Sequence, residues 1–435
     1  MERRILHVDF NSFYASVACC LHPELARHAV AVAGDPEARH GIILAKNELA
    51  KKFGVKTGEA IWQAKQKCPN LVTVAPEFAQ YQDFSRRGKQ IYTEYSDRVE
   101  GFGLDENWID ISGLAKNFQD ATGIAEEIRA RVHKELGITV SVGVAANKVF
   151  AKLGSDIKKP DAVTMISPEN YRDVAWPLPV NELLYVGRAT EGKLNRYGIK
   201  TIGELAITPA AFLKAQFGKC GLMLHAFANG QDVSPVMRID DETPVKSVGN
   251  GVTTPRDLVN NEDVYLTVCM LAESVGARLR AQNMRARTIA LSIRDTGLYS
   301  FTRQARLEKP THITNEIAQA AMRLFTAYYA WQVPVRSLTV TACDLINEDT
   351  PVQLSLLGDE TSRVRAETLD GAIDRIRNRY GHGAINRALF LKDPMLGCIN
   401  PKEDHTIHPV GYLHNGSMED MIDPAVQKKL YEPSR

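Results

Sequence analysis

Short apolar runs and helical spacings of apolar residues alternate along the first 165 residues of the chain. Runs typical of buried strands are followed by stretches with apolar residues every three or four positions. Strands are expected at 5–9, 29–34, 41–45, 98–103, 107–112 and 138–145, and helices at 10–21, 47–55, 60–68, 78–96, 122–137 and 147–160. Their order, with α/β material inserted after the first strand, predicts a split βαβ sheet with helices on one face.

The rest of the chain predicts two more folded parts and a tail. Residues 166–235 are helical and punctuated by glycines. Residues 245–346 form a separate α+β unit with strands at its start and at 287–295, 299–307 and 335–343, and helices at 261–282 and 311–330. Residues 347–362 are linker-like, 363–381 predict a charged helix, and the last stretch of about 50 residues predicts an extended tail.

Composition limits the possible classes of protein. A chain of 435 residues is too long for one ordinary core, so we expect several domains. Hydrophobic residues make up 44% and charged residues 24%, both near the averages of globular proteins. The net charge of +1 gives no general case for binding nucleic acid or membrane, so any basic surface must be local.

Cysteine usage and the apolar runs indicate a cytoplasmic protein. The seven cysteines are odd in number and form no Cys-x-x-Cys pair, which favours a reducing compartment. The N-terminus reaches Asp9 before an apolar signal segment can form, and no run approaches the length of a membrane span. We expect a monomer with no membrane contact.

Three carboxylates are the first candidates for chemistry. Asp9 ends the first expected strand, while Asp105 and Glu106 occupy the turn of the expected hairpin. If these strands are neighbours, the three acids meet at one edge of the sheet and need protons or a cation. Oxygen ligands favour Mg²⁺, and two such ions suit in-line displacement at phosphorus. The alternative is a set of solvated turn acids.

Four motifs together resemble the Y-family, or translesion, DNA polymerases of bacteria. They are HVDFNSFYASV (7–17), GLDENWIDIS (103–112), NKVFAKLGSDIKKP (147–160) and KSVGNGVTT (246–254), and the resemblance runs from Arg4 to about Leu391. It implies an α+β, multidomain, right-hand polymerase with a split βαβ (ferredoxin-like) palm, small fingers, a helical thumb with a helix-hairpin-helix, and an α+β little finger. The implied boundaries are palm 1–10 and 78–165, fingers 11–77, thumb 166–235, little finger 242–346, and 347–435 for a linker with a clamp-binding motif, a helix and the tail.

The resemblance also implies roles for single residues. Two Mg²⁺ ions would be held by Asp9, Asp105, Glu106 and the Phe10 carbonyl, with Asp9, Asp105 and Glu106 as the catalytic acids. Tyr14 would be the steric gate against ribonucleotides, Phe13 would pack behind it, and Lys159 would reach the triphosphate. The alternatives are core aromatics and a solvated helix end.

The implied activity is low-fidelity, template-directed DNA synthesis in translesion synthesis, DNA repair and the SOS response to DNA damage. The enzyme would add deoxynucleoside triphosphates (dNTPs) to a primer 3′ end on primer–template DNA. One rival is a catalytically silent scaffold that binds DNA and a sliding clamp, and another is a nucleotide cyclase built on the same palm.

Three positions depart from the family pattern and leave the subfamily open. Asn11 stands where many members have Asp. Glu48 and Lys51 stand where polymerase IV-like enzymes place a Tyr and an Arg on the triphosphate. Lys51 still offers a charge, whereas Glu48 is expected to point away from the nucleotide because it would repel it. The AKN…AK pattern is closer to the catalytic subunit of polymerase V.

Two segments are candidates for holding DNA. Residues 184–206 resemble a helix-hairpin-helix, in which Gly187 would help expose backbone N–H groups to a phosphate, although a plain helix pair is an alternative. Residues 278–309 carry eight basic and two acidic side chains, and strand alternation leaves one face free for DNA. The predicted phosphate contacts are Arg285, Arg287, Arg294, Arg303 and Arg306, against the alternative of a solvated face.

A five-residue peptide, QLSLL (353–357), resembles the clamp-binding peptide of bacterial polymerases. Its anchors for a sliding clamp (beta clamp) would be Gln353, Leu354, Leu356 and Leu357. The alternative is an ordinary linker or edge strand. In the tail, Cys398, His405 and His408 match no familiar zinc spacing, so a plain tail is expected there.

Overall fold

The computed structural model describes residues 2–35, 39, 41–241, 244–351, 360–397, 399, 421, 422 and 426. The chain divides into two compact units. The first unit comprises Met1–Gly34, Ile42–Thr243 and His408–Arg435, and the second comprises Asp35–Gly41 and Pro244–Ile407. Among the described helices, none has both the length and the apolar character needed to cross a bilayer.

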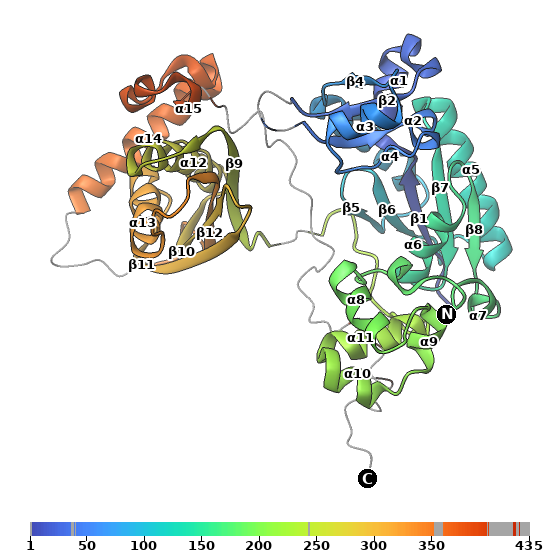
Figure 1. Ribbon diagram of the computed structural model, residues 1–435. Helices are drawn as coiled ribbons and strands as arrows, with labels where there is room; N and C mark the ends of the chain where they lie inside the picture. Colours follow the sequence, from blue (N-terminus) through green and yellow to red (C-terminus); the bar gives the residue numbers. More distant parts are fainter. Residues whose placement is uncertain are drawn as a thin grey trace. The chain divides into compact units, whose positions relative to one another are not determined.

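The first unit is built on a five-stranded sheet, the palm sheet (Figure 1). It contains β1 (Ile5–Phe10), β5 (Val99–Phe102), β6 (Glu106–Asp110), β7 (Val140–Ala145) and β8 (Val163–Ile166) in the order β5-β6-β1-β7-β8. β1 runs antiparallel to both β6 and β7, although they lie about 100 residues and more away in sequence. The predicted split βαβ arrangement is confirmed, and β8 adds a fifth strand parallel to β7.

Helices cover both faces of the palm sheet, so the prediction of helices on one face is wrong. Leu6, Val8 and Phe10 form one core with α4 (Phe78–Thr93) and α5 (Phe118–Leu136). On the opposite face α6 (Lys148–Ile157) packs against β1, β7 and β8. Gly143 of β7 permits this close approach, because a Cβ there would lie 1.8 Å from the Ala151 carbonyl oxygen of α6.

The material inserted after β1 has a small sheet and core of its own. Its strands β2 (Val30–Ala33), β3 (Ile43–Lys46) and β4 (Val72–Val74) lie in the order β3-β2-β4. The helical pieces are α1 (Phe13–Leu21), η1 (Pro23–Arg27), α2 (Glu48–Lys52) and α3 (Ile61–Lys67). Ile43, Ala50 and Ala64 meet in this core. The expected strand–helix order is confirmed, with β4 as an addition.

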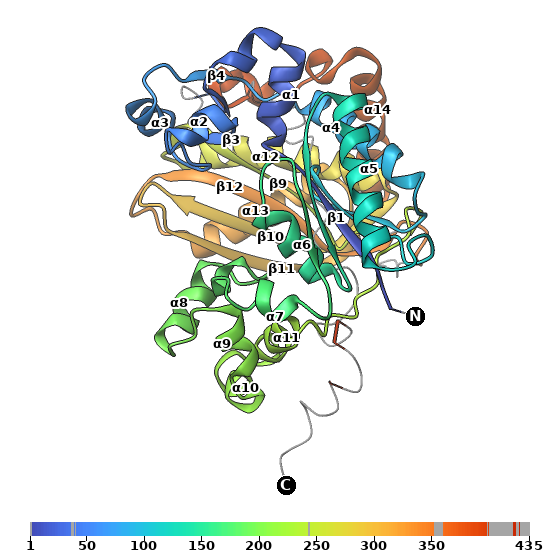
Figure 2. The same cartoon turned by 90° about the vertical axis from the view of Figure 1, so that its right-hand side faces the viewer.

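The region from 166 to 235 is helical as predicted (Figure 2). It contains α7 (Tyr171–Val174), η2 (Val180–Glu182), α8 (Arg188–Arg196), α9 (Ile202–Ile207), α10 (Ala210–Phe217) and α11 (Lys219–Ala228). Its apolar residues share one core with α6, in which Phe150 and Phe227 are buried. This part of the chain is therefore packed onto the face of the palm sheet that α6 covers.

Part of the predicted tail is folded into the same core. Met421 and Ile422 are 6% and 2% exposed. The Val233 N–H donates to the Met421 carbonyl oxygen at 3.0 Å, and Asp232 pairs with Ile422 as an antiparallel bridge. The expectation of a plain tail is wrong at these positions, because two large apolar side chains gain more from burial than from solvent.

The second unit has a four-stranded antiparallel sheet in the order β11-β10-β12-β9. Its elements are β9 (Ser247–Leu258), α12 (Asn261–Ala281), β10 (Met284–Asp295), β11 (Ser300–Thr311), α13 (Thr314–Tyr328) and β12 (Val335–Asn347). The predicted element order is confirmed, while the strand order differs from that of the palm sheet. Apolar residues of α12 and α13 pack on one face of the sheet.

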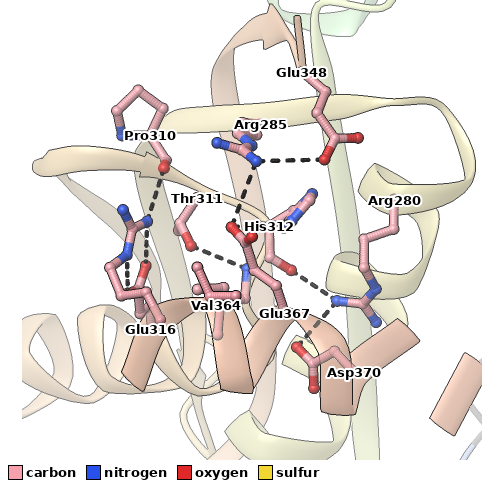
Figure 3. A network of polar contacts seen from close by, with 12 residues as sticks. Arg280, Arg285, Pro310, Thr311, His312, Glu316, Glu348, Val364, Glu367 and Asp370 are labelled. Atoms are coloured by element: carbon pink, nitrogen blue, oxygen red, sulfur yellow. Dashed lines mark hydrogen bonds and ion pairs between the residues drawn. The ribbon is translucent and has the colours of Figure 1, made fainter. Parts of the chain in front are cut away.

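A charged helix, α14 (Glu360–Tyr380), docks on this unit mainly through polar contacts (Figure 3). Asp370 accepts a hydrogen bond from the Thr314 N–H at 2.8 Å and so caps α13, whose own N-cap residue Ile313 has no side chain able to do so. The same carboxylate pairs with Arg280 at 3.2 Å. The predicted helix is therefore an integral part of the unit.

Three short pieces follow α14, namely η3 (His382–Ala384), η4 (Ala388–Lys392) and α15 (Pro394–Gly397). Phe390 and Leu396 are buried in the core of the second unit. This stretch also departs from the predicted extended tail, because its few apolar residues are spaced to reach one core.

Candidate active site

Strand register brings the three predicted carboxylates together. Asp9 of β1 lies directly opposite Glu106 of β6, and the Phe10 N–H donates to the Asp105 carbonyl oxygen at 3.1 Å. All three acids line one pocket of about 380 Å³, whose wall also includes the Phe10 position. The predicted meeting of residues 9, 105 and 106 at one edge of the sheet is confirmed.

Two lysines from the α6 region pair with two of these acids. The Lys159 ammonium lies 2.6 Å from Asp9 Oδ2 and 2.7 Å from Asp156 Oδ1. Lys152 forms an ion pair with Glu106. Asp105 forms no ion pair with a basic side chain of the described residues, and it therefore carries the least compensated negative charge of the three.

The pKa values follow this division. Burial, with the nearby charges of Asp9 and Glu106, raises the pKa of Asp105 to about 7. Burial also raises the pKa of Asp9, despite the opposing charge of Lys159. Burial alone would raise the pKa of Glu106, but contacts with His7 and Lys152 lower it to about 2.

The donor set fits a hard divalent cation. Among the described residues, no three His, Cys, Asp or Glu side chains are arranged to hold a metal ion, and Asp9 and Glu106 pair with lysines. The donors available in the pocket are nevertheless carboxylate oxygens, which suit Mg²⁺. The raised pKa of the buried Asp105 marks a concentration of negative charge that such an ion would neutralise.

The two predicted aromatic contacts occupy different environments. Tyr14 lines the pocket and stacks on Tyr81 with ring centroids 4.2 Å apart. Phe13 is 4% exposed and stacks on Phe10 at 5.0 Å, so it serves the core even though it reaches the pocket wall. Tyr14 is thus held at the pocket wall by its stack on Tyr81, and the Phe13 ring lies against it at 5.6 Å.

Glu48 and Lys51 both line the pocket from the first turns of α2. The Ser12 hydroxyl donates to Glu48 Oε1 at 3.2 Å, and the Lys51 ammonium lies 3.4 Å from the same oxygen. The expectation that Glu48 points away is wrong, because these two groups hold its carboxylate at the pocket. Lys51 is at the predicted place but is partly neutralised.

Asn11 has a structural role at the edge of the pocket. It is 5% exposed, and its side-chain amide donates to Ser141 Oγ at 2.9 Å. Its oxygen accepts from Thr139 Oγ1 at 3.0 Å and from the Asp161 N–H at 2.8 Å. Asn11 therefore ties the end of β1 to the loop that follows Lys159.

His7 is a neighbour of the site that the sequence reasoning missed. It is fully buried, and its Nε2 lies 3.2 Å from Glu106 Oε2. The available signal was strand periodicity, because residues 7 and 9 of one strand lie on the same face.

The predicted phosphate contacts of the second unit fall into two groups. Ile289, Leu291 and Ile293 face the helix-covered core, so Arg294 lies on the open face of the sheet. Arg306 pairs in register with Thr288 and lies on that same open face.

The remaining arginines and Gly187 occupy other positions. Arg285 pairs with Glu348 at 3.3 Å and Glu367 at 3.5 Å, and is engaged inside the unit (Figure 3). Arg303 lies opposite Leu291 with its guanidinium over the Phe301 ring, toward the covered face. Arg287 lies at the β-bulge between the two strands. Gly187 is the N-cap of α8, and a Cβ added there would meet open space.

The predicted clamp peptide, with Gln353, Leu354, Leu356 and Leu357, lies outside the described residues, as do Cys398, His405 and His408.

Comparisons with known proteins agree with this architecture. The model of the impB/mucB/samB family matches residues 8–156, and the model of its C-terminal domain matches residues 245–356. A model described as the DNA polymerase-iota thumb domain matches residues 182–232. A solved Y-family DNA polymerase chimera has a similar fold, with a TM-score of 0.70 and 23% identity over 79% of this chain and 99% of its own.

The chain belongs to the impB/mucB/samB family and is a bacterial Y-family DNA polymerase, as its motifs predicted. DNA polymerase IV of Acetivibrio thermocellus is 52% identical over 92% of this chain and 100% of its own. DNA polymerase IV of Pelotomaculum thermopropionicum is 37% identical over 90% and 96%, and DNA polymerase IV 2 of Bacillus subtilis is 36% identical over 90% and 95%.

Replacement of Lys159 should change the affinity of the free protein for a divalent cation. Lys159→Met frees Asp9 and removes a positive charge beside it, so Mn²⁺, used as a probe without nucleotide, should bind on the order of ten-fold more tightly. Electron paramagnetic resonance titration of free Mn²⁺ measures this. The neighbouring Lys158→Met is the control and should change the affinity far less. Unchanged affinity in Lys159→Met would contradict the site.

Proposed function

We propose that this chain is a polymerase IV-like enzyme that extends primers across damaged templates at low fidelity. It is a DNA-directed DNA polymerase, with primer–template DNA and dNTPs as substrates. The observation that carries the proposal is the meeting of Asp9, Asp105 and Glu106 in one pocket beside Tyr14. The names of the relatives favour polymerase IV over polymerase V, which the Glu48 and Lys51 positions had left open.

The chemistry assigned to the pocket is two-metal phosphoryl transfer with Mg²⁺. Asp9, Asp105, Glu106 and the Phe10 carbonyl would hold the ions, which would activate the primer 3′-hydroxyl and neutralise charge on the triphosphate. In this arrangement Asp9 would no longer pair with Lys159, and the lysine would be available to a phosphate oxygen. Glu106 stays ionised because its pKa is about 2.

Two further groups would select and hold the nucleotide. Tyr14, fixed by its stack on Tyr81, would lie under the sugar and exclude a 2′-hydroxyl, with Phe13 packed against it. Lys51 would add positive charge from the fingers side, reduced by its pairing with Glu48.

The domain boundaries are assigned as palm 1–10 and 78–165, fingers 11–77, thumb 166–235 and little finger 242–346. The helix α14 and the short pieces that follow it pack on the little finger beyond its assigned end. The enzyme would act as a cytoplasmic monomer. Size-exclusion chromatography with light scattering tests the oligomeric state. A catalytically silent scaffold is not favoured, because all three acids are present and meet in one pocket.

Primer extension tests the proposed function. Asp105→Ala removes the acid with the least compensated charge and should reduce extension with Mg²⁺ and dNTPs by about 100-fold or more, since it removes transition-state stabilisation. The control Asp173→Ala changes an exposed carboxylate and should leave the rate unchanged. Equal rates in wild type and Asp105→Ala would refute the assignment.

Sugar selection tests the role of Tyr14. Tyr14→Ala should raise incorporation of ribonucleotides relative to deoxynucleotides by about 10-fold or more, because relief of one small steric clash is worth roughly 1–3 kcal/mol. Incorporation of each nucleotide type by both proteins is compared in single-turnover reactions. The control is Tyr197→Ala, because Tyr197 is an exposed tyrosine at the C-terminal end of α8 and does not line the pocket. Unaltered selectivity in Tyr14→Ala would assign the gate elsewhere.

Salt dependence of DNA binding tests the open face of the second unit. The doubly substituted Arg294→Gln, Arg306→Gln protein should bind primer–template more weakly, and its log–log salt slope should fall by about 2. Arg303→Gln, at a position toward the covered face, should keep the wild-type slope. Fluorescence anisotropy across a salt series measures both, and an unchanged slope in the double variant would exclude this face.

Clamp binding is proposed for residues 353–357. Leu356→Ala with Leu357→Ala removes two apolar anchors and should abolish capture of the protein by an immobilised sliding clamp. Leu369→Ala, an exposed leucine on α14, is the control and should bind as wild type. Normal capture of the double variant would show that the peptide is not the anchor.

A further inference from the structure

Two lysines pair with acids of the pocket, and the structure holds them in different ways. Lys159 lies in the loop after α6, its side chain is 27% exposed, and its ammonium is shared between Asp9 and Asp156. Lys152 lies within α6, its side chain is 16% exposed, and it pairs with Glu106. Because loops move more easily than packed helices, the helix lysine has less freedom than the loop lysine to leave its partner.

An aromatic ring limits the position of the Lys152 ammonium. Its Nζ lies 5.4 Å from the centroid of the Phe102 ring, a distance at which a cation is attracted to the ring face. Phe102 pairs in register with Glu106 across the β5–β6 hairpin. The Phe102 ring also lies against the fully buried Trp108, with centroids 5.2 Å apart. The ammonium therefore contacts a packed ring and a carboxylate of the same hairpin.

The helix that carries this lysine is itself fixed to the palm sheet. A Cβ at Gly143 of β7 would lie 1.8 Å from the Ala151 carbonyl oxygen, so α6 packs closely on that strand. The Trp108 Nε1 donates to the Lys148 carbonyl oxygen at 3.0 Å and ties α6 to β6, the strand that begins with Glu106. The backbone of α6 therefore has a set position relative to the Glu106 carboxylate.

The ion pair distinguishes the two oxygens of the Glu106 carboxylate. The Lys152 ammonium lies against Oε2, while Glu106 also lines the pocket that it shares with Asp9 and Asp105. An ammonium and a divalent cation repel each other, so an ion that binds in this pocket would approach Oε1. Lys152 therefore leaves Oε1 as the oxygen of Glu106 that is available to an ion.

We propose that Lys152 is a positioning residue for Glu106, a role that rests on the proposed function. Lys152 keeps Oε2 of the carboxylate in place while ions and nucleotide enter, whereas Lys159 would give up Asp9 in the proposed arrangement. A displacement of about 1 Å in such a group can cost on the order of 100-fold in rate. Loss of the Lys152 ammonium should therefore slow the chemical step rather than weaken nucleotide binding.

Two substitutions separate the charge of Lys152 from its apolar stem. Lys152→Met removes the ammonium and keeps a stem of similar length, whereas Lys152→Arg keeps a cation that can donate to Oε2. In single-turnover incorporation, Lys152→Met should lower the maximal rate by about 10- to 100-fold and leave the apparent Kd for dNTP within about two-fold of wild type. Lys152→Arg should recover most of the rate. The control Lys134→Met, at an exposed position of α5, should behave as wild type.

Crystal structures of the two Lys152 variants complete the test, and thermal unfolding shows that each is folded at the assay temperature. The Glu106 carboxylate should keep its wild-type orientation in Lys152→Arg and leave it in Lys152→Met. A wild-type rate in Lys152→Met, an unmoved Glu106 in its crystal structure, or an equal loss of rate in both variants would overturn the proposal. An inactive wild-type enzyme would refute the proposed function alone, because the orientation of Glu106 is read without activity.

Discussion

Electrostatic repulsion among three acids is the constraint on which the rest of the site depends. The register of β1 with β6 fixes Asp9 opposite Glu106, so the backbone keeps the two carboxylates close together. Their charge must be balanced locally, and the ammonium groups of Lys152 on α6 and of Lys159 in the loop that follows α6 do so. The position of α6 against the sheet is therefore as much a part of the site as the acids.

Much of this arrangement could be predicted from sequence. Strand periodicity and the position of Asp9 at a strand end predicted that Asp9 lies close to Asp105 and Glu106, because hydrogen-bonded strands have few alternative registers. Element order was equally informative in both units. Motif resemblance then supplied the family, which the comparisons with known proteins confirm.

Other features depend on contacts that no local pattern encodes. The close packing of α6 on the sheet depends on the absence of a side chain at Gly143, which the sequence pattern alone shows as one more strand residue. Arg285 lies in a basic stretch of the sequence, yet it forms ion pairs with Glu348 and with Glu367 of α14, both distant in sequence. From the sequence, Glu48 was expected to repel a triphosphate and to point away from it. Its carboxylate instead accepts a hydrogen bond from the hydroxyl of Ser12, which belongs to the start of α1 and not to α2.

The docking of Met421 has a consequence for the chain as a whole. Arg3 near one terminus donates to the Ser234 carbonyl oxygen at 2.7 Å, and Met421 near the other accepts from the adjacent Val233. In sequence, most of the second unit is therefore inserted within the first. The chain leaves the first unit after Thr243 and returns to it at His408. Proteolytic cleavage of one of these two connections would leave the second unit covalently attached to the first through the other connection.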